Sequence, residues 1–475
     1  MFQSRRTVTI LTLALCVVYI AVRLWRLTDS CLWFDEIFSV HAAEHEWNSL
    51  FWFVAQDLIH PPLFYVLLKV WMSIGGESLI WLRLFPVFFS GLVLGPFIYL
   101  CRELKLKTPA MLLGLVFLAV NGSLIKYAQE VRMYAPLLFF SVVSTWLFAR
   151  FYFRGKNIWI LTLVNVLLIY THYFGWFVIA SEVAAIFIFQ RVKIRHVLIM
   201  SGIALAAFVP WVIAVLRASS DGADVTQNIG WMARPGIRES FRFVFDVIEP
   251  FYYQQSNADA STILYVTIPL LLTIGAAKIL MWMDWKREDD RGALYLVGLF
   301  VAVPILLAFA ISWLAPVSIW GSRHLIIVFA PVAIMFGIFL SSVDTKPVRY
   351  GLIGFTLLLF LLAFVTRVRT PQTEYVWCGW EQVASEWALT PHNGAGPKRL
   401  YAFEDLAAYH LWFATRKTPN HRVSLMTGVD GILNDPAYFL PRGFDGVRKT
   451  VVEEITDERI WLAFRTPKSN EEAPL

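Results

Sequence analysis

Residues 79–107 read LIWLRLFPVFFSGLVLGPFIYLCRELKLK, an apolar run that ends in a cluster of basic residues. The run at 79–100 is long enough to cross a hydrocarbon core of ~30 Å as a helix, for which about 20 apolar residues suffice. Arg102, Lys105 and Lys107 follow it at once. Because short loops rich in Lys and Arg stay in the cytoplasm, this stretch predicts a transmembrane helix that ends on the cytoplasmic side.

The same alternation of apolar runs and basic loops extends along most of the chain. It predicts about eleven transmembrane helices, near 7–25, 79–100, 108–125, 133–152, 157–173, 174–190, 197–216, 261–283, 292–313, 323–341 and 350–366. These spans place the basic clusters on one face, at Arg5/Arg6, Arg102 to Lys107, Arg150 to Lys156, Arg191 to Arg195, Lys286 to Arg291 and Lys346/Arg349. That face is predicted to be cytoplasmic, and the N-terminus lies on it.

One further apolar segment, residues 61–75, is not counted as a span. As a helix it would be about 22 Å long at 1.5 Å per residue, which is short of the bilayer core. Length alone does not decide, because the runs at 108–125 and 157–173 are also short. Counting 61–75 would invert every later loop and put basic clusters outside. We therefore predict an interfacial or re-entrant helix that begins at the Pro61–Pro62 pair.

The composition agrees with a membrane protein and argues against a nucleic-acid partner. Of the 475 residues, 58% are hydrophobic and only 16% are charged, which is too little charge to cover a soluble protein of this size. The net charge of +6 and the pI near 9.0 would suit a nucleic-acid-binding protein. The basic residues lie mainly in short loops between spans, so topology accounts for them better.

The chain divides into a transmembrane domain at 1–367 and a soluble external α/β domain at 368–475. External loops at 26–78, which contains the helix 61–75, and at 217–260 belong to the first domain. In the tail, helices are predicted at Trp380–Leu389 and Leu406–Thr415, and strands at Arg399–Phe403, His421–Met426 and Arg459–Phe464.

The cysteines do not show the spacing of a metal site. In the predicted topology, Cys31 and Cys378 are the two that share the external face. A disulfide between them is a hypothesis that follows from this placement.

Two adjacent carboxylates, Asp35 and Glu36, follow Trp33–Phe34 in the first external loop. Partial desolvation beside a membrane would raise their proton affinity, so that one of them could act as a general base. The alternative is structural: Asp35 caps a helix and Glu36 lies in its first turn.

Other polar residues gather on the same external face. Glu130 and Arg132 stand between two spans, where they could orient a substrate and bind an anionic group, or simply pair with each other. His60 precedes the Pro pair and is either a turn residue or part of this cluster. His172 lies in a tight hairpin, where the neighbouring Tyr173 is explained as an aromatic anchor at the bilayer surface.

Arginines on an external face oppose the positive-inside trend and call for a reason. Arg323, followed by His324, and Arg83 are both predicted at external ends of spans. Their planar guanidinium groups suit a phosphate, since they can donate two parallel hydrogen bonds. The alternative is that they extend to lipid headgroups.

The combination of these motifs resembles the GT-C superfamily of membrane glycosyltransferases. The residues that carry the resemblance are Trp33–Phe34–Asp35–Glu36, His60–Pro61–Pro62–Leu63, Gln129–Glu130–Val131–Arg132–Met133–Tyr134 and Ser322–Arg323–His324. The pattern is similar to glycosyltransferase family 39 and its bacterial relatives, which include protein O-mannosyltransferases and the lipid A aminoarabinose transferase. The similarity covers roughly residues 1–345.

The resemblance implies a fold of many spans beneath external loops, and transfer of a sugar from a polyprenyl-phosphate carrier with inversion. It implies that Asp35 is the base, with Glu36 as second choice, and that Glu130 is a second acid. His60 and Arg323 would bind the carrier phosphate; the family often has Tyr where this chain has His324.

The remaining implications concern the setting of the enzyme. Arg83, Arg132, Tyr134 and His172 would complete the substrate site. The acceptor would be a lipid, glycan or protein, in a bacterial inner membrane with the tail in the periplasm. Relatives differ in metal dependence, so a divalent cation is left open.

Two other classes stay open from the sequence alone. A transporter would place acids inside its spans and show repeated halves, whereas Glu182 is an exception among spans nearly free of acids. A non-catalytic protein that binds a polyprenyl lipid would carry the same external cluster without chemistry.

Overall fold

The computed structural model describes residues 5–223, 225–251, 262–283, 289–370, 378–391, 396–427, 440–442, 444–455 and 460–463. Most of the predicted loops and spans fall within these ranges. The predicted basic loop residues Lys286 and Arg287 lie outside them, as do Arg459 and Phe464 at the ends of the last predicted strand.

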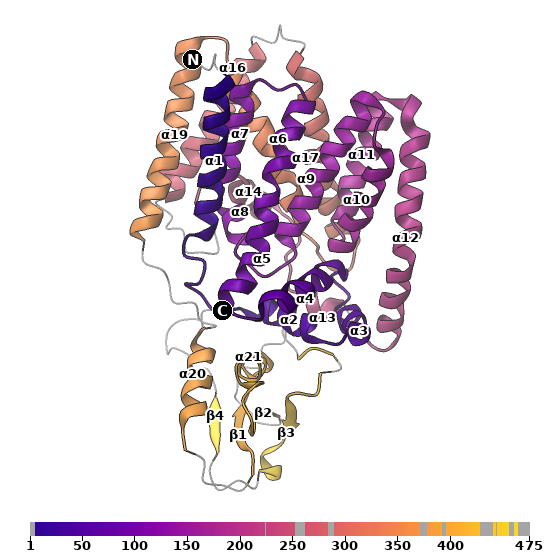
Figure 1. Ribbon diagram of the computed structural model, residues 1–475, viewed down its shortest axis with the longest axis vertical. Helices are drawn as coiled ribbons and strands as arrows, with labels where there is room; N and C mark the ends of the chain where they lie inside the picture. Colours follow the sequence, from indigo (N-terminus) through magenta and orange to yellow (C-terminus); the bar gives the residue numbers. More distant parts are fainter. Residues whose placement is uncertain are drawn as a thin grey trace.

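A helical bundle forms the larger part of the molecule (Figure 1). In the described residues, eight helices are long and apolar enough to cross a membrane. They are α1 (Arg5–Leu24), α5 (Leu79–Leu92) continued by α6 (Leu94–Glu103), α9 (Tyr134–Arg154), η1 (Arg191–Lys193) continued by α12 (Ile194–Ser220), η3 (Ile263–Thr267) continued by α16 (Ile268–Met283), α17 (Asp289–Leu314), η4 (His324–Val328) continued by α18 (Phe329–Ser341), and α19 (Lys346–Arg369). The chain is an integral membrane protein.

Three predicted spans are shorter than expected. They are α7 (Thr108–Val120), α10 (Ile158–Thr171) and α11 (Gly175–Phe189). The predicted span 108–125 is divided because Asn121 is extended and caps a second helix, α8 (Gly122–Tyr127), by accepting a hydrogen bond from Leu124 N at 3.0 Å.

The centre of the bundle is the contact between α7 and α18. A Cβ atom on Gly337 of α18 would lie 2.1 Å from the carbonyl oxygen of Ala110, so only glycine allows this approach. Gly114 of α7 faces Ala333 in the same way, at 3.1 Å. Small residues commonly allow such close packing between membrane helices. The α18 span is 89% buried, which makes it the core around which the other helices stand.

Short helices cover the end of the bundle that the sequence predicts to be external, hereafter called the external end. Helices α2 (Phe34–Glu44), α3 (Trp47–Asp57) and α4 (Leu63–Gly75) lie at the end opposite the start of α1 (Figure 1). Helix α4 is the segment predicted as interfacial or re-entrant; it begins just after Pro62 and packs against α2, α5 and α10. The loop between α12 and η3 carries α13 (Thr226–Ile229) and α14 (Ile237–Ile248).

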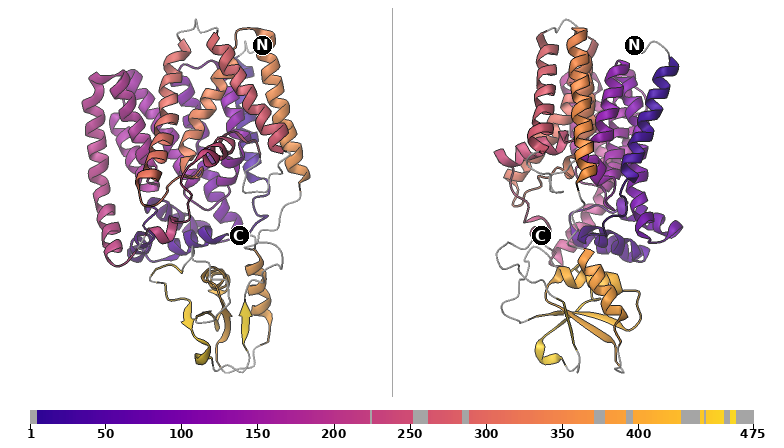
Figure 2. Two further views of the ribbon diagram at one scale, coloured as in Figure 1. Left: turned by 180° about the vertical axis from the view of Figure 1, so that it is seen from behind. Right: turned by 90° about the vertical axis from the view of Figure 1, so that its left-hand side faces the viewer.

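The C-terminal residues form a small α/β domain at the same external end (Figure 2). It contains α20 (Cys378–Leu389), β1 (Lys398–Ala402), α21 (Asp405–Thr415), β2 (His421–Met426), β3 (Arg448–Thr450), η5 (Val452–Glu454) and β4 (Trp461–Ala463). The strands are parallel in the order β3-β2-β1-β4, with Tyr401 opposite Ser424 and Leu462.

The elements predicted for the tail agree closely with this domain, apart from β3. The sequence of β3, Arg-Lys-Thr, is short and charged, so it carries no strand signal of its own. It pairs with β2 from Ser424 to Met426, and this pairing makes it a strand.

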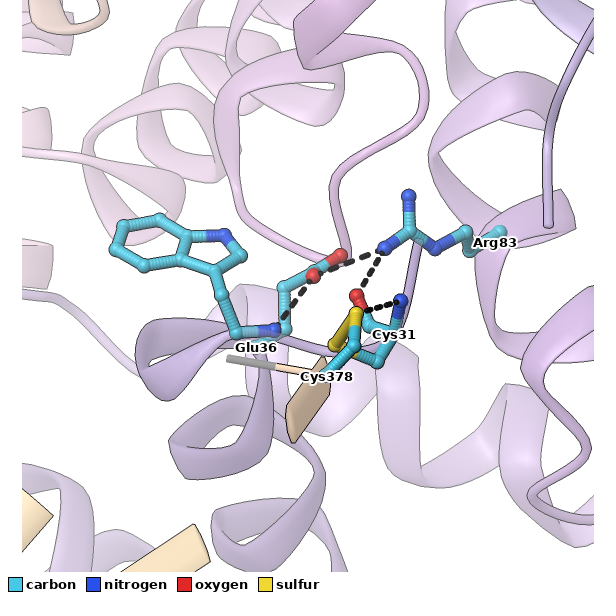
Figure 3. The surroundings of a disulfide bond; sticks show 5 residues. Cys31, Glu36, Arg83 and Cys378 are labelled. Carbon is cyan, nitrogen blue, oxygen red and sulfur yellow. Dashed lines mark hydrogen bonds and ion pairs between the residues drawn. A yellow bond between two sulfur atoms is a disulfide. The ribbon is translucent and has the colours of Figure 1, made fainter. Parts of the chain in front are cut away.

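Cys31 and Cys378 form a disulfide, as hypothesised, with their Cα atoms 5.4 Å apart. The bridge joins the residues just before α2 to the first residue of α20 (Figure 3). The C-terminal domain is therefore tied covalently to the segment just before α2, the helix that carries Asp35 and Glu36.

Candidate active site

Asp35 lies in the first turn of α2, between two arginines from distant parts of the chain. Its Oδ2 atom is 3.7 Å from Arg132 Nη2 and 3.9 Å from Arg323 Nη1. These are ion pairs rather than direct hydrogen bonds. The side chains of Asp35 and Arg323 are 25% and 21% exposed, so a solute can reach both. The predicted convergence of these two groups is therefore present in the fold.

Arg132 fixes the geometry on the protein side of this cluster. Its Nη1 donates to the backbone oxygen of Asp35 at 3.0 Å and to Ser39 Oγ at 3.2 Å. The side chain is 4% exposed, against 21% for Arg323. Arg132 is thus a fixed partner of Asp35, and Arg323 is the arginine that an incoming anion can contact.

Glu36, the neighbour of Asp35, is fully buried and has partners for both oxygens. Its Oε2 accepts hydrogen bonds from Arg83 Nη2 and Trp33 N, each at 3.1 Å, and its Oε1 accepts one from Val131 N at 2.8 Å. Burial raises the pKa of Glu36, while Arg83 acts in the opposite direction. This carboxylate joins α2 to the loop at 129–132 and has no contact with solvent.

Arg83 is occupied in the same way. Besides Glu36, it donates to the backbone oxygen of Cys31 at 2.9 Å (Figure 3). It also donates to the backbone oxygen of Gln129 at 3.0 Å. The side chain is 6% exposed. This geometry favours a positioning role for Glu36 and Arg83 over the catalytic and substrate-binding roles that the sequence suggests for them.

Glu130 lies on the loop that Glu36 holds, in a second charged group. Its Oε1 is 3.6 Å from Lys126 Nζ at the end of α8. Burial lowers the pKa of Lys126, and Glu130 acts against that shift. Glu130 is close enough to Glu36 to raise the pKa of that carboxyl. Of the two predicted acids, Asp35 is the sequence neighbour of the buried Glu36, and Glu130 acts on Glu36 by its charge.

Three histidines form a line of rings beside this cluster. The ring centroids of His60 and His172 are 5.6 Å apart, and those of His172 and His324 are 5.3 Å apart. His60 Nδ1 pairs with Asp57 Oδ2 at 3.1 Å. Burial, assisted by Arg132, lowers the pKa of His60 well below its usual value. His60 is therefore neutral, a form that both donates and accepts hydrogen bonds.

The aromatic residue predicted for the site, Tyr134, lies behind these rings. It is the first residue of α9 and is 1% exposed. Its ring centroid is 6.4 Å from that of His324 and 4.9 Å from that of Tyr127. Tyr134 therefore packs against the site from within the protein.

A cavity of about 250 Å³ adjoins Arg323. Its lining comes from the α13–α14 loop, from α14 and from the segment before η4, and it includes Trp231, Arg242, Asp246, Trp320 and Arg323. The Arg323 guanidinium carbon is 5.2 Å from the Trp231 ring centroid. Asp57, Trp231, Arg242 and Asp246 border the cluster and were not among the site residues predicted from the sequence.

No group of three His, Cys, Asp or Glu side chains in the described ranges is arranged to hold a metal ion. The arginines of the cluster suit an anion, and the Asp35 carboxylate can accept a proton.

Neither a family model nor a curated protein matches this sequence. Solved structures do. The chain is similar to ArnT from Cupriavidus metallidurans in the apo state, with a TM-score of 0.55, 15% identity, and coverage of 90% of this chain and 87% of that one. The fold is that of the GT-C glycosyltransferases.

ArnT bound to undecaprenyl phosphate matches with a TM-score of 0.50 and 14% identity, over 90% of this chain and 87% of that one. The Archaeoglobus fulgidus oligosaccharyltransferase, tethered to an acceptor peptide, matches with a TM-score of 0.52 and 11% identity over 88% of this chain. This chain spans only 64% of that oligosaccharyltransferase. At such identities the likeness concerns the GT-C fold.

Proposed function

We propose that this protein is an inverting glycosyltransferase that moves a sugar from a polyprenyl-phosphate carrier to a lipid, glycan or protein acceptor. The observation that supports this most is the position of Asp35 between Arg132 and Arg323 at the external end of a GT-C bundle. The undecaprenyl phosphate bound by the similar ArnT structure supports a carrier of this chemical class.

The site is proposed to lie outside the cytoplasm, in a bacterial inner membrane with a cytoplasmic N-terminus. The positive-inside rule supports this orientation. The Cys31–Cys378 disulfide is independent support, because such bonds persist in oxidising compartments. Both arguments support a periplasmic position of the cluster and the C-terminal domain.

In the proposed reaction, the donor phosphate binds Arg323 at the level of the lipid headgroups. The guanidinium of Arg323 then pairs with the phosphate instead of Asp35, while Arg132 keeps the Asp35 carboxylate in place. An acceptor hydroxyl attacks the anomeric carbon from the side opposite the phosphate. Its proton passes to Asp35 as the new C–O bond forms.

The bond between the anomeric carbon and the phosphate oxygen breaks in the same step. The electron pair stays on the polyprenyl phosphate, and Arg323 offsets the charge that develops there. Neutral His60, with His172 and His324 beside it, supplies hydrogen bonds to the sugar or the phosphate. Glu130 is proposed as a second acid that orients the acceptor.

The deciding experiment is turnover of a panel of polyprenyl-phosphate sugars by purified wild type, Asp35→Asn and Asp29→Asn. Asp29 is a matched control because it is a carboxylate of the same external loop, 39% exposed, that pairs with Arg26. Wild type and Asp29→Asn should turn over at least one donor. Asp35→Asn should lose about 10²–10⁴-fold in kcat, the usual contribution of a general base.

Full activity in Asp35→Asn would overturn the assignment of the base and leave the class intact. No turnover of any donor by wild type, combined with measurable binding of a polyprenyl phosphate, would replace transfer by lipid binding without chemistry.

A further inference from the structure

Helix α2 carries Asp35 and is held by the C-terminal domain at both of its ends. In the part of the chain that the structure describes, the domain reaches α2 through the Cys31–Cys378 disulfide and through α21. The disulfide and the contacts of α21 and Arg416 differ in chemistry, and each can be removed by its own substitution.

The first attachment acts on the start of α2. Cys31 N donates to Cys378 Sγ at 3.1 Å, in addition to the covalent bond. The carbonyl oxygen of Cys31 accepts a hydrogen bond from Arg83 Nη2, the same atom that donates to Glu36 (Figure 3). The disulfide therefore fixes one of the oxygens that orient Arg83, and Arg83 in turn fixes the residue next to Asp35.

The second attachment acts along α2 through Tyr409 of α21. The Tyr409 hydroxyl is 2.8 Å from His41 Nδ1, and its ring is edge-on to Phe34, with centroids 5.5 Å apart. Phe34 and His41 are two turns apart on one face of α2. The rings of Trp412 and Phe444 complete the contact around His41, at 4.7 and 5.1 Å.

The far end of α2 is fixed by charge. Arg416, just after α21, donates from Nη2 to Glu44 Oε1 at 2.6 Å and to Glu77 Oε2 at 2.9 Å. Glu44 is the last residue of α2, and Glu77 lies between α4 and α5. Arg416 therefore joins α2 to the bundle from the side of the C-terminal domain.

We propose that the C-terminal domain is a positioning clamp for α2, in which Cys378, Tyr409 and Arg416 hold Asp35 at the distance from Arg132 and Arg323 that the reaction requires. This inference rests on the proposed function, because it assigns Asp35 the role of base. Cys378, Tyr409 and Arg416 are positioning residues, since each acts through α2.

The physical reason is that Asp35 is at the exposed end of a short helix. Helix α2 has 11 residues, and a helix of that length is marginal without tertiary contacts. The distances from Asp35 to its arginines already exceed hydrogen-bond length. A displacement of about 1 Å in such a group can cost about 10²-fold in rate.

The test uses the full chain with Cys31→Ala/Cys378→Ala, which removes the disulfide, and Arg416→Ala, which removes the charged attachment. The matched control is Arg448→Ala, another arginine of the same domain that pairs with Glu454 and is 77% exposed. Tyr409→Phe removes one hydroxyl and is the variant that best preserves folding.

The clamp predicts that the Cys pair and Arg416 variants lose about tenfold or more in kcat with little change in donor KM, because an interaction of the transition state is lost. It also predicts that the same changes have no further effect in an Asp35→Asn background, since they act through Asp35. Arg448→Ala should match wild type.

A loss of kcat that is equally large in the Asp35→Asn background would overturn the clamp and leave a merely structural role. Wild-type kcat in both variants would also overturn it.

Amide hydrogen exchange provides a readout that does not need activity. Removing the disulfide or the Arg416 ion pair should raise the rate of amide exchange in α2 more than in α5. Arg448→Ala should leave the rate in α2 unchanged. Unchanged exchange in α2 would overturn the clamp even if no donor is turned over, and faster exchange without turnover would reject the proposed function alone.

Discussion

Two groups of polar side chains, one buried inside the bundle and one at its external end, surround a carboxylate in opposite ways. Inside the bundle, Glu182 of α11 is fully buried; its oxygens lie 2.8 Å from Ser144 Oγ and 2.7 Å from Asn165 Nδ2. At the external end, Asp35 is a quarter exposed and meets Arg132 and Arg323 at 3.7 and 3.9 Å.

The difference shows what each group can do. The Glu182 network is closed, because α9, α10 and α11 each supply one of its members at hydrogen-bond distance. Such a network stabilises helix packing and leaves no group for a passing solute. Asp35 keeps an exposed carboxylate beside an arginine that another anion can reach. A transporter would need an acid within its spans that a solute can reach, which Glu182 is not, whereas a transferase can use an accessible carboxylate such as Asp35.

The largest expected effect is a loss of kcat on replacement of Arg323, which tests whether the external cluster is the reactive one of the two groups. Replacing Arg323 by Ala removes the cation opposite the leaving phosphate and should cost about 10²–10³-fold in kcat, the range seen when a group that stabilises developing charge is lost. Arg323→Lys keeps the charge without the planar fork and should recover part of the rate. Steady-state kinetics with the donor found for wild type measures both.

Arg234→Ala is the control for Arg323. Arg234 is an exposed arginine of the same external face that donates to the carbonyl oxygen of Ala315. A similar loss of rate in both variants would mean that the charge of the external surface, rather than Arg323 itself, supports activity.

The next effect concerns stability within the bundle. Glu182→Ala should leave Ser144 and Asn165 without their shared acceptor and cost about 1–3 kcal/mol of stability, with kcat unchanged below the melting temperature. Thermal unfolding in detergent and donor turnover check the two halves of this statement. A loss of kcat in a folded Glu182→Ala protein would show that the bundle acid takes part in function and would revive the transporter alternative.

The smallest effect is a change in pH dependence. Burial raises the pKa of Asp57 to about 7, from 3.8 in a free side chain. Between these two pKa values, the folded protein keeps a proton on Asp57 that the unfolded chain releases. The protonation of Asp57 therefore contributes fully to the free energy of unfolding below about pH 4, and this contribution is lost as the pH rises through about 7.

The asparagine side chain in Asp57→Asn does not titrate. The melting temperature of this variant should therefore fall less than that of wild type between about pH 5 and 8. The exposed Asp29→Asn variant should keep the wild-type slope. Equal slopes for Asp57→Asn and wild type would show that Asp57 is ionised in the folded protein throughout this window.

Much of the fold was predictable from local pattern. Apolar runs and basic loops located the helices of the bundle, because crossing a bilayer requires a long apolar segment and the cytoplasmic loops collect positive charge. The strands β1 and β2 and the helices α20 and α21 were predictable for the same kind of reason, a local alternation of apolar and polar residues. The break at Asn121 and the strand β3 were not, since each depends on a tertiary partner.

The candidate site was predictable in membership and less so in role. Asp35, Arg132 and Arg323 were singled out by their place on the external face, and the fold brings them together. The sequence could not distinguish Asp35 from Glu36, because adjacent residues share a local environment. Only the burial of Glu36 and its bonds to Arg83 separate an accessible carboxylate from one that holds a loop.

The sequence by itself determined that this is a membrane protein with a polar external face, because hydropathy and charge act over short stretches of chain. The tertiary structure alone decided which acid faces solvent, and that the C-terminal domain holds the helix beneath it through Cys378, Tyr409 and Arg416. The burial of Glu36 depends on contacts with residues 47 and 95 positions away, and the contacts of the C-terminal domain with α2 join residues 347 to 372 positions apart. No local pattern encodes such contacts.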